Sequence, residues 1–308
     1  MAGEPSGRLN AVTGVAGYSG RRMAERLLRM GERVLTLTGH PDRPTPFGEL
    51  VRAAPFHFDQ ADKLTESLRG VEVLYNTYWI RFPRGGMTYE KAVENTRTLI
   101  RAAVQAGVRR IVHVSITNPS HDSPFGYFRG KGQVEDEIVG SGLSYAILRP
   151  AVLFGGEDIL INNIAWTLRR LPVFAIPGSG EYRLQPIHVD DLADLAVEHS
   201  HRQANVVLDA VGPEAYTYSD LVRLIAAAIG RRPLLVHLPP RLFYWLSLPI
   251  SQLVRDVLIT WDEVLGLMAD LLVSSGPPTA PTRLSDWLTE NRGAVGRRYA
   301  SEVERHFR

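Results

Sequence analysis

The fold of this chain is decided by the stretch TGVAGYSG, residues Thr13 to Gly20. It lies between an apolar run, Leu9 to Val12, and a helix-like segment, Arg21 to Met30. A strand that turns sharply into a helix needs glycines, because glycine tolerates unusual backbone angles. The N-terminus of that helix presents N–H groups and the positive end of its dipole to an anion. The stretch therefore predicts a cradle for a pyrophosphate, as in a dinucleotide.

The spacing G-x-x-G-x-x-G alone also fits a glycine-rich turn that binds nothing, so the neighbouring sequence has to decide. Gly31 to Arg33 closes the helix, and Val34 to Thr38 has the pattern of a second strand. Strand, glycine turn, helix and second strand together form the βαβ unit that a dinucleotide motif requires.

Strands and helices continue to alternate after this unit. Further strands are expected at Pro55 to Phe58, Val71 to Asn76 and Arg110 to Ser115, with helices at Ala61 to Arg69 and Thr88 to Ala106. This alternation predicts an α/β fold with a doubly wound parallel Rossmann sheet and right-handed crossovers.

The second half of the chain predicts a smaller, mainly helical C-terminal substrate domain. We expect residues 8–155 to form the dinucleotide-binding domain, with residues 181–212 returning to it. Residues 156–180 and 213–308 are then the substrate domain.

Composition excludes several classes of function. The 308 residues contain no cysteine, which excludes disulfides, thiolate metal sites and cysteine nucleophiles, and no metal site is expected. The net charge of +2 is spread along the chain and does not indicate nucleic-acid binding. Met1 to Arg8 lacks the apolar core of a signal peptide, and no run reaches the roughly 20 apolar residues of a membrane span. A cytoplasmic protein is expected.

A tyrosine and a lysine four residues apart, Tyr127 and Lys131, follow the fifth strand at the start of a helix. Residues with this spacing lie on one helix face, about 5–6 Å apart at Cβ. A nearby cation favours the phenolate and lowers the phenol's pKa from about 10, so such a tyrosine can move a proton near neutrality. The alternative is a surface tyrosine beside a solvated lysine. The position after the fifth strand and the scarcity of lysine, with only Lys63 and Lys91 elsewhere, favour the functional interpretation.

These features resemble the short-chain dehydrogenase/reductase superfamily. The later segments resemble its extended and atypical branches, the NAD-dependent epimerase/dehydratase family, which include NmrA-like proteins and the nucleotide-binding accessory subunit of respiratory complex I. The motifs that carry the resemblance are Thr13 to Gly20, Asp59, Asn95, Ser115-Ile116-Thr117, Tyr127 with Lys131, Leu148-Arg149-Pro150, Phe154-Gly155, and Gln185 to Leu192.

The resemblance implies catalytic roles for five residues. Tyr127 would be the general acid/base, and Lys131 would bind the nicotinamide ribose while acidifying Tyr127. Thr117, or Ser115 as second choice, would orient the substrate carbonyl, and Asn95 would be structural or part of a proton relay.

The resemblance also implies a set of cofactor-binding residues. Asp59 is expected either to accept a hydrogen bond from the adenine or to cap the following helix. The expected set is Gly14, Gly17, Tyr18, Ser19, Gly20, Arg21, Gly39, Arg43, Asp59, Asn76, Tyr127, Lys131 and Pro150.

The end of the second strand bears on the choice between NAD and NADP. Family members that prefer NAD usually carry a carboxylate there for the ribose 2′-hydroxyl, whereas this chain has Thr38-Gly39-His40. Arg21, Arg22 and Arg43 are available for a 2′-phosphate, which a guanidinium fork matches, although Arg21 and Arg22 also fit a solvated helix face. We therefore expect NADP, with NAD as the alternative.

Two functions remain open from the sequence. One is an NAD(P)-dependent oxidoreductase or epimerase acting on a small-molecule hydroxyl or carbonyl. The other is a non-catalytic dinucleotide-binding redox sensor or assembly subunit. Nucleotide-sugar epimerases typically carry an asparagine within the segment that corresponds to Arg149 to Gly155, and this chain is apolar there, which weakens a sugar nucleotide as substrate. A homodimer is possible.

The stretch Leu242 to Leu253, which contains the aromatic run Phe243-Tyr244-Trp245, has no assigned role. Core packing, a roof over the substrate pocket, a dimer surface and a membrane-resting surface all fit its composition.

Overall fold

The computed structural model describes residues 7–303, so most of the segment Met1 to Arg8 lies outside the described residues. The chain forms two compact units. Among the described residues, the first comprises 7–149 and 192–208, and the second comprises 150–191 and 209–303. This division differs from the sequence prediction in three segments, because residues 150–155, 181–191 and 209–212 belong to the second unit.

The first unit is built on a seven-stranded sheet in the order β11-β6-β5-β4-β1-β2-β3. Neighbouring strands from β6 to β3 pair in parallel. Thr13 of β1, for example, lies beside Leu37 of β2, and Asn76 of β4 lies beside His113 of β5. The doubly wound α/β prediction is confirmed. The strands are β1 (Leu9–Thr13), β2 (Arg33–Thr38), β3 (Val51–Pro55), β4 (Val73–Asn76), β5 (Arg110–Val114), β6 (Ser144–Pro150) and β11 (Val206–Ala210).

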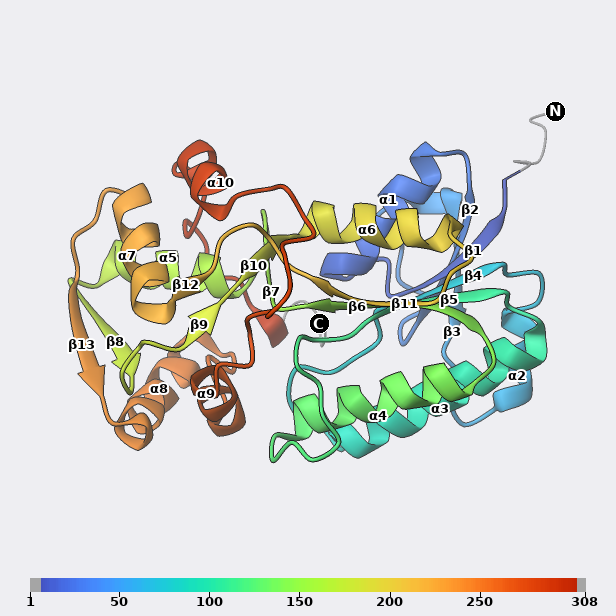
Figure 1. Cartoon of the computed structure of the whole chain (residues 1–308), viewed down its shortest axis with the longest axis horizontal. Coiled ribbons are helices and arrows are strands. Elements are labelled where there is room, and N and C mark those ends of the chain that lie inside the picture. The colour runs from blue at the N-terminus through green and yellow to red at the C-terminus, as the bar shows by residue number, and fades with distance from the viewer. Residues whose placement is uncertain (1–6, 304–308) are drawn as a thin grey trace. The chain divides into compact units, whose positions relative to one another are not determined.

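Helices cover both faces of this sheet (Figure 1). On one side lie α1 (Tyr18–Arg29) and α6 (Val189–His201); on the other lie α2 (Ala61–Ser67), α3 (Tyr89–Ala106) and α4 (Gly126–Gly140). Helix α3 begins at Thr88, whose hydroxyl accepts from the Lys91 N–H, and ends at Gly107 with φ +76°. Leucine, isoleucine and valine side chains of the strands and helices form a dry core between them. Because the paired strands run parallel, their carboxyl ends lie together at one edge of the sheet.

The third strand lies earlier than the sequence predicts. It spans Val51–Pro55, not Pro55 to Phe58. Phe56 and Phe58 stack on each other with ring centroids 4.7 Å apart, and both contact Tyr78. Their aromatic rings therefore pack together in the loop that follows the strand. Aromatic residues favour strands, and this is why the sequence pattern placed the third strand too late.

Arg110 ties the returning segment of the chain to the sheet. Its side chain is fully buried on β5 and donates from Nε to the carbonyl of His199 (2.8 Å) and from Nη2 to that of Ala204 (2.9 Å). It also bonds the Ser144 hydroxyl. A buried guanidinium is tolerated only when its donors are satisfied, and here the acceptors are the end of α6 and the loop that leads into β11.

The second unit packs helices around three two-stranded pieces. β7 (Val152–Phe154) pairs in parallel with β10 (Pro186–His188), β8 (Val173–Pro177) with β13 (Leu234–Leu238), and β9 (Arg183–Leu184) antiparallel with β12 (Tyr216–Thr217). Its helices are α5 (Leu160–Arg170), α7 (Tyr218–Ala228), α8 (Pro240–Val254), α9 (Trp261–Met268) and α10 (Leu284–Asn291), and most of them surround a core of their own.

Candidate dinucleotide and acid–base site

The glycine stretch forms a tight turn between β1 and α1. Gly14 has φ +71° and its N–H donates to the Leu37 carbonyl of β2 (2.9 Å). A Cβ on Gly20 would lie 2.5 Å from the Gly14 carbonyl oxygen, and one on Gly17 would lie 3.1 Å from it. The first glycine is thus required by the backbone angle, and the other two by close packing of helix against turn.

The N-terminus of α1 has the features of an anion site. Its N-cap residue, Gly17, provides no side-chain cap, and the first turn carries no acidic side chain. Tyr18 and Ser19 begin the helix, half-buried. The positive end of the dipole therefore lies at a turn with no carboxylate of its own, so the residues present fit a dinucleotide pyrophosphate.

The arginines expected to read a 2′-phosphate are engaged within their own helix. Arg21 Nε lies 3.2 Å from Glu25 Oε1, and Arg22 Nη1 lies 3.1 Å from Glu25 Oε2. Both ion pairs are partly exposed, so solvent screens them and each arginine can leave Glu25 at little cost in free energy. Arg43 and Gly39 lie exposed beyond β2. The region therefore offers cations but no carboxylate at the strand end.

Asp59 lies exposed beyond β3 and accepts a hydrogen bond from the Gln60 side chain (3.2 Å), which lowers the pKa of its carboxyl. Helix α2 has Gln60 at its N-cap, and no side chain caps it. The helix-capping alternative for Asp59 is therefore wrong, because the chain enters the helix one residue later.

The loop after β4 is held to β1 by hydroxyl and amide hydrogen bonds. Thr77 donates from Oγ1 to the Thr13 carbonyl (2.6 Å) and from its N–H to Thr13 Oγ1 (2.7 Å). Asn76 is fully buried, and its Oδ1 accepts from the Tyr78 N–H (3.1 Å). Asn76 therefore shapes the loop with its side chain.

Asn95 lies buried on α3 and donates to the Tyr78 phenol oxygen (2.8 Å). Burial raises the pKa of Tyr78, and the Asn95 hydrogen bond opposes this in part. The structure thus places Asn95 against the tyrosine of the β4 loop. Its prediction as a structural or relay residue stays a prediction.

Lys131 is buried on α4, with only 2% of its surface exposed. Its ammonium donates to the Val114 carbonyl at the end of β5 (2.7 Å) and lies 4.7 Å from the centre of the Trp79 ring. Burial lowers the pKa of Lys131 to about 7, with Glu135 acting in the opposite direction. The side chain therefore changes charge close to neutral pH, held by one carbonyl and one aromatic face.

Tyr127 lies one turn before Lys131 in an aromatic setting. Its ring meets Trp79 and Tyr89 nearly edge-on, with centroids 5.9 and 6.1 Å apart, and contacts Phe128. A Cβ on Gly130 would lie 2.8 Å from the Trp79 ring, so the glycine lets that ring pack closely on α4. Trp79 thus contacts both members of the predicted pair.

The two hydroxyl residues after β5 differ in their surroundings. Thr117 is fully buried in the loop that follows the strand. Ser115 donates its hydroxyl to Glu135 of α4, and Glu135 in turn pairs with Arg149 of β6. Ser115 as the second choice for orienting a substrate stays a prediction, and its hydroxyl is held by a buried carboxylate in this structure.

His113 was not predicted from the sequence. It is fully buried on β5, and its Nδ1 lies 3.1 Å from the Asn76 side-chain nitrogen, so Nδ1 is assigned as the acceptor and Nε2 as protonated. Burial first, and then the Lys131 charge, lower its pKa well below the usual value, so His113 is neutral. Within residues 7–303 its Nε2 has no hydrogen-bond partner.

Glu135 and Trp79 also contact the predicted site residues and were not predicted. The sequence offers a signal for Glu135 but not for Trp79. Glu135 follows Lys131 by four residues on the same helix, a spacing that predicts contact along α4. Trp79 lies outside any helix or strand, so no periodicity places it on Lys131. Pro150, the remaining predicted cofactor residue, is buried as the last residue of β6.

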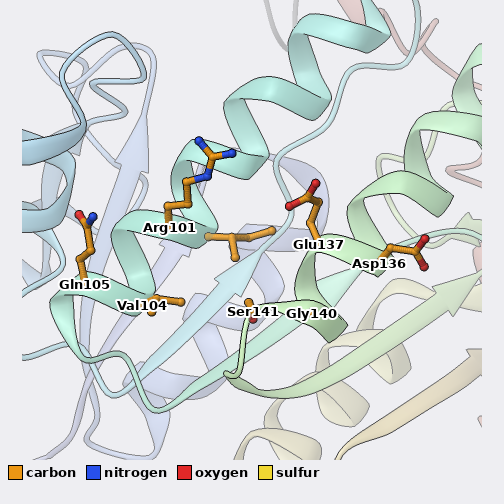
Figure 2. A pocket seen from close by; sticks show the side chains of 8 residues that line it. Arg101, Val104, Gln105, Asp136, Glu137, Gly140 and Ser141 are labelled. Atoms are coloured by element: carbon orange, nitrogen blue, oxygen red, sulfur yellow. The ribbon is translucent and has the colours of Figure 1, made fainter.

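A hollow of about 500 Å³ lies elsewhere, between α3 and α4. Figure 2 shows its lining, with Arg101 and Val104 on one helix and Asp136 and Glu137 on the other. None of the predicted site residues lines it. It opens between outer helices and not at the carboxyl edge of the sheet, where parallel α/β sheets bind ligands.

Residues 14–165 match a family model described as NAD(P)H-binding. Over 290 residues the chain is 25% identical to NADH dehydrogenase (ubiquinone) 1 alpha subcomplex subunit 9, mitochondrial, of Arabidopsis thaliana, covering 87% of this chain and 72% of that protein.

Two solved structures share the fold. A nucleoside-diphosphate-sugar epimerase from Staphylococcus aureus superimposes with a TM-score of 0.69 at 17% identity, covering 92% of this chain and 99% of that chain. MoeE5 in complex with UDP-glucose and NAD superimposes with a TM-score of 0.66 at 20% identity, covering 93% and 98%. These structures confirm the fold that the sequence resemblance implies, and the chain carries an NAD(P)-binding domain.

Across residues 7–303, no helix is both long and apolar enough to cross a membrane. The same residues contain no group of three or more histidine, aspartate or glutamate side chains placed to hold a metal ion.

Proposed function

We propose that this NAD(P)-binding chain is an oxidoreductase or epimerase that acts on a hydroxyl or carbonyl group of a small molecule. The observation that carries the proposal is the pair Tyr127 and Lys131 on α4, with the lysine ammonium held at the end of β5 by the Val114 carbonyl. That location is the carboxyl edge of a parallel sheet whose first turn fits a pyrophosphate.

A bound nicotinamide supplies the hydride chemistry, and the protein supplies orientation and proton transfer. In this proposal Tyr127 donates or accepts the proton on the substrate oxygen, and Thr117 holds that oxygen. Lys131, when protonated, is the cation that would favour the phenolate form of Tyr127. Ser115 has a different part, since its bond to Glu135 fixes the end of β5 against α4.

We propose NADP as the preferred cofactor. Support comes from the end of β2, where Thr38-Gly39-His40 carries no carboxylate. Further support comes from Arg43 in the loop that follows and from Arg21 and Arg22 near the start of α1. Because Arg21 and Arg22 share Glu25, a 2′-phosphate would have to compete with one carboxylate for two guanidinium groups.

A second candidate function is a non-catalytic dinucleotide-binding subunit. It is favoured by the surroundings of Lys131, whose ammonium donates to Val114 and lies on the Trp79 ring. In that position the lysine is a packed structural cation. The relative named as a subunit of NADH dehydrogenase supports the same alternative.

The experiment that separates the two functions follows the consumption of reduced cofactor. Purified protein is mixed with NADPH or NADH and a panel of aldehydes, ketones and sugar nucleotides, and absorbance of the reduced nicotinamide is recorded. We expect turnover by the parent protein. Tyr127→Phe should retain cofactor binding, measured by calorimetry, and lose at least about 100-fold in turnover, the usual range for a general acid/base.

Tyr145→Phe is the matched control, since Tyr145 is half-buried on β6 and lies outside the site. It should turn over at the parental rate. Equal rates in the parent and Tyr127→Phe would refute the catalytic assignment. Tight cofactor binding with no consumption of reduced cofactor across the panel, and with no epimer formed from the sugar nucleotides in the presence of oxidised cofactor, would favour the subunit alternative.

A further inference from the structure

Helix α8 of the second unit carries a stripe of exposed apolar side chains. Trp245 is 67% exposed and Leu253 is 82% exposed. The stripe consists of Leu242, Trp245, Leu246, Ile250 and Leu253, together with the exposed Pro249. Spacings of three and four residues place all of them on one side of the helix. Scattered apolar residues on a surface need no explanation, but a contiguous stripe does.

The opposite side of α8 attaches the helix to its own unit. Tyr244 packs edge-on against Trp261 of α9, with ring centroids 5.7 Å apart. Ser247 is buried and donates to the Tyr244 carbonyl (2.7 Å). Figure 1 shows α8 beside α9. The core face is therefore already occupied, and the stripe is a second apolar face on the same helix.

Positive charge flanks the stripe at both ends. Arg241 is the only charged residue of α8, Arg255 follows directly after it, and both are exposed. Neither forms an ion pair within residues 7–303. The nearest carboxylate in sequence, Asp256, is buried and accepts from the Glu302 and Val303 N–H groups. The sequence of α8 itself thus combines apolar side chains with a basic residue and contains no acidic one.

We propose that this stripe docks on the surface of an anionic phospholipid bilayer, with α8 lying in the plane of the interface. An interfacial helix of this kind combines an apolar face that enters the acyl boundary with basic residues that meet lipid phosphates. A tryptophan suits the interface, because its ring is apolar and its N–H bonds the headgroup layer. At about 1.5 Å per residue, α8 is about 22 Å long, enough for in-plane binding.

Self-association fits the stripe less well than a membrane does. In a second copy packed stripe to stripe, antiparallel helices would bring Arg241 to Arg255, and parallel helices would bring each arginine to its own equivalent. Either arrangement sets like charges at both ends of an apolar seam, which is unfavourable. Lipid phosphates neutralise both ends at once.

The test is co-sedimentation of the full chain with vesicles of phosphatidylcholine alone and of phosphatidylcholine mixed with phosphatidylglycerol. We expect binding to the anionic vesicles and weaker binding as salt is raised. The double variant Trp245→Glu/Leu253→Glu should bind at least tenfold more weakly, because two exposed apolar anchors become charged. Leu50→Glu, at an equally exposed leucine of the first unit, is the matched control and should bind like the parent.

A second pair of variants tests the charges. Arg241→Gln and Arg255→Asn should each weaken binding to anionic vesicles by about fivefold, the worth of one basic residue near such a surface. Asparagine is chosen at 255 because that residue has φ +53°. Circular dichroism verifies that each variant is folded.

Three outcomes would overturn the proposal. The first is no binding of the parent to either vesicle type, and the second is equal loss of binding in Leu50→Glu. The third is a parent dimer, seen by sedimentation without vesicles, that the double variant dissociates; the stripe would then be an interface between copies. None of these outcomes depends on whether the protein turns over a substrate.

Discussion

The two halves of the candidate site are built in different ways. The glycine turn is made of backbone, since Gly14 supplies a positive φ and Gly20 allows the helix to approach a carbonyl oxygen. The Tyr127–Lys131 half is made of side chains from several elements, with Trp79 packed on both members. The shape of the turn is therefore set by backbone angle and close packing. The acid–base half depends on the charge of a buried lysine and on the position of one indole ring.

The largest effect should come from filling the space beside the turn. Gly20→Ala places a methyl group 2.5 Å from the Gly14 carbonyl oxygen, a backbone atom that cannot move aside cheaply. Overpacking of this kind costs about 1–3 kcal/mol. We expect a lower free energy of unfolding by urea and at least a 100-fold loss of NADPH affinity by calorimetry. Gly140→Ala, at a helical glycine with open space around it, should change neither by more than a small amount; similar losses in both variants would contradict the role of the turn.

The buried lysine predicts a pH dependence of stability. Burial lowers the pKa of Lys131 from 10.5 to about 7. Between these pH values the unfolded chain holds a proton that the folded chain has released, so stability from this group rises with pH, by at most about 1.4 kcal/mol per pH unit. Below pH 7 both states are protonated and the contribution is constant.

Lys131→Met should remove this rise. Urea unfolding of parent and variant at pH 6, 7.5 and 9 should show the parent gaining about 2 kcal/mol on the variant between the last two points. Lys91→Met removes an exposed lysine of α3 and should leave the pH profile parallel to the parent. A difference between parent and Lys131→Met that does not vary with pH would show that the ammonium stays charged.

The smallest effect is expected from Gly39→Asp, which tests the preference between NADPH and NADH at the glycine-turn half of the site. Gly39 has open space where a side chain would lie, and its φ is outside the left-handed region, so Gly39→Asp fits without strain. A carboxylate there would repel a 2′-phosphate by about 1–4 kcal/mol and accept from a 2′-hydroxyl. We expect NADPH affinity to fall about tenfold and NADH to become the preferred cofactor. Gly39→Asn is the uncharged control, and an unchanged preference in Gly39→Asp would mean that this residue does not face the ribose.

Sequence patterns predicted those features of the fold and site that depend on residues close together in the chain. The glycine turn and the four-residue spacing of Tyr127 and Lys131 both lie within one element or one junction, where periodicity and backbone demand are visible in the sequence. The strand β13 was not predicted, because its pairing partner β8 lies about 60 residues away and its apolar run is short. The contact of Trp79 with Lys131 joins a loop to a distant helix, and the bond between Ser115 and Glu135 likewise depends on how α4 packs on β5.

The burial of Arg110 has a consequence for how the chain is made. Its guanidinium needs carbonyls from His199 and Ala204, and the sheet needs β11 to cover β6, yet more than 40 residues of the second unit, 150–191, are synthesised in between. During vectorial synthesis the first unit therefore waits, with an exposed strand edge and an unsatisfied cation, until residue 208 has left the ribosome. A fragment that ends at residue 165, where the NAD(P)H-binding family match stops, would remain in that unfinished state.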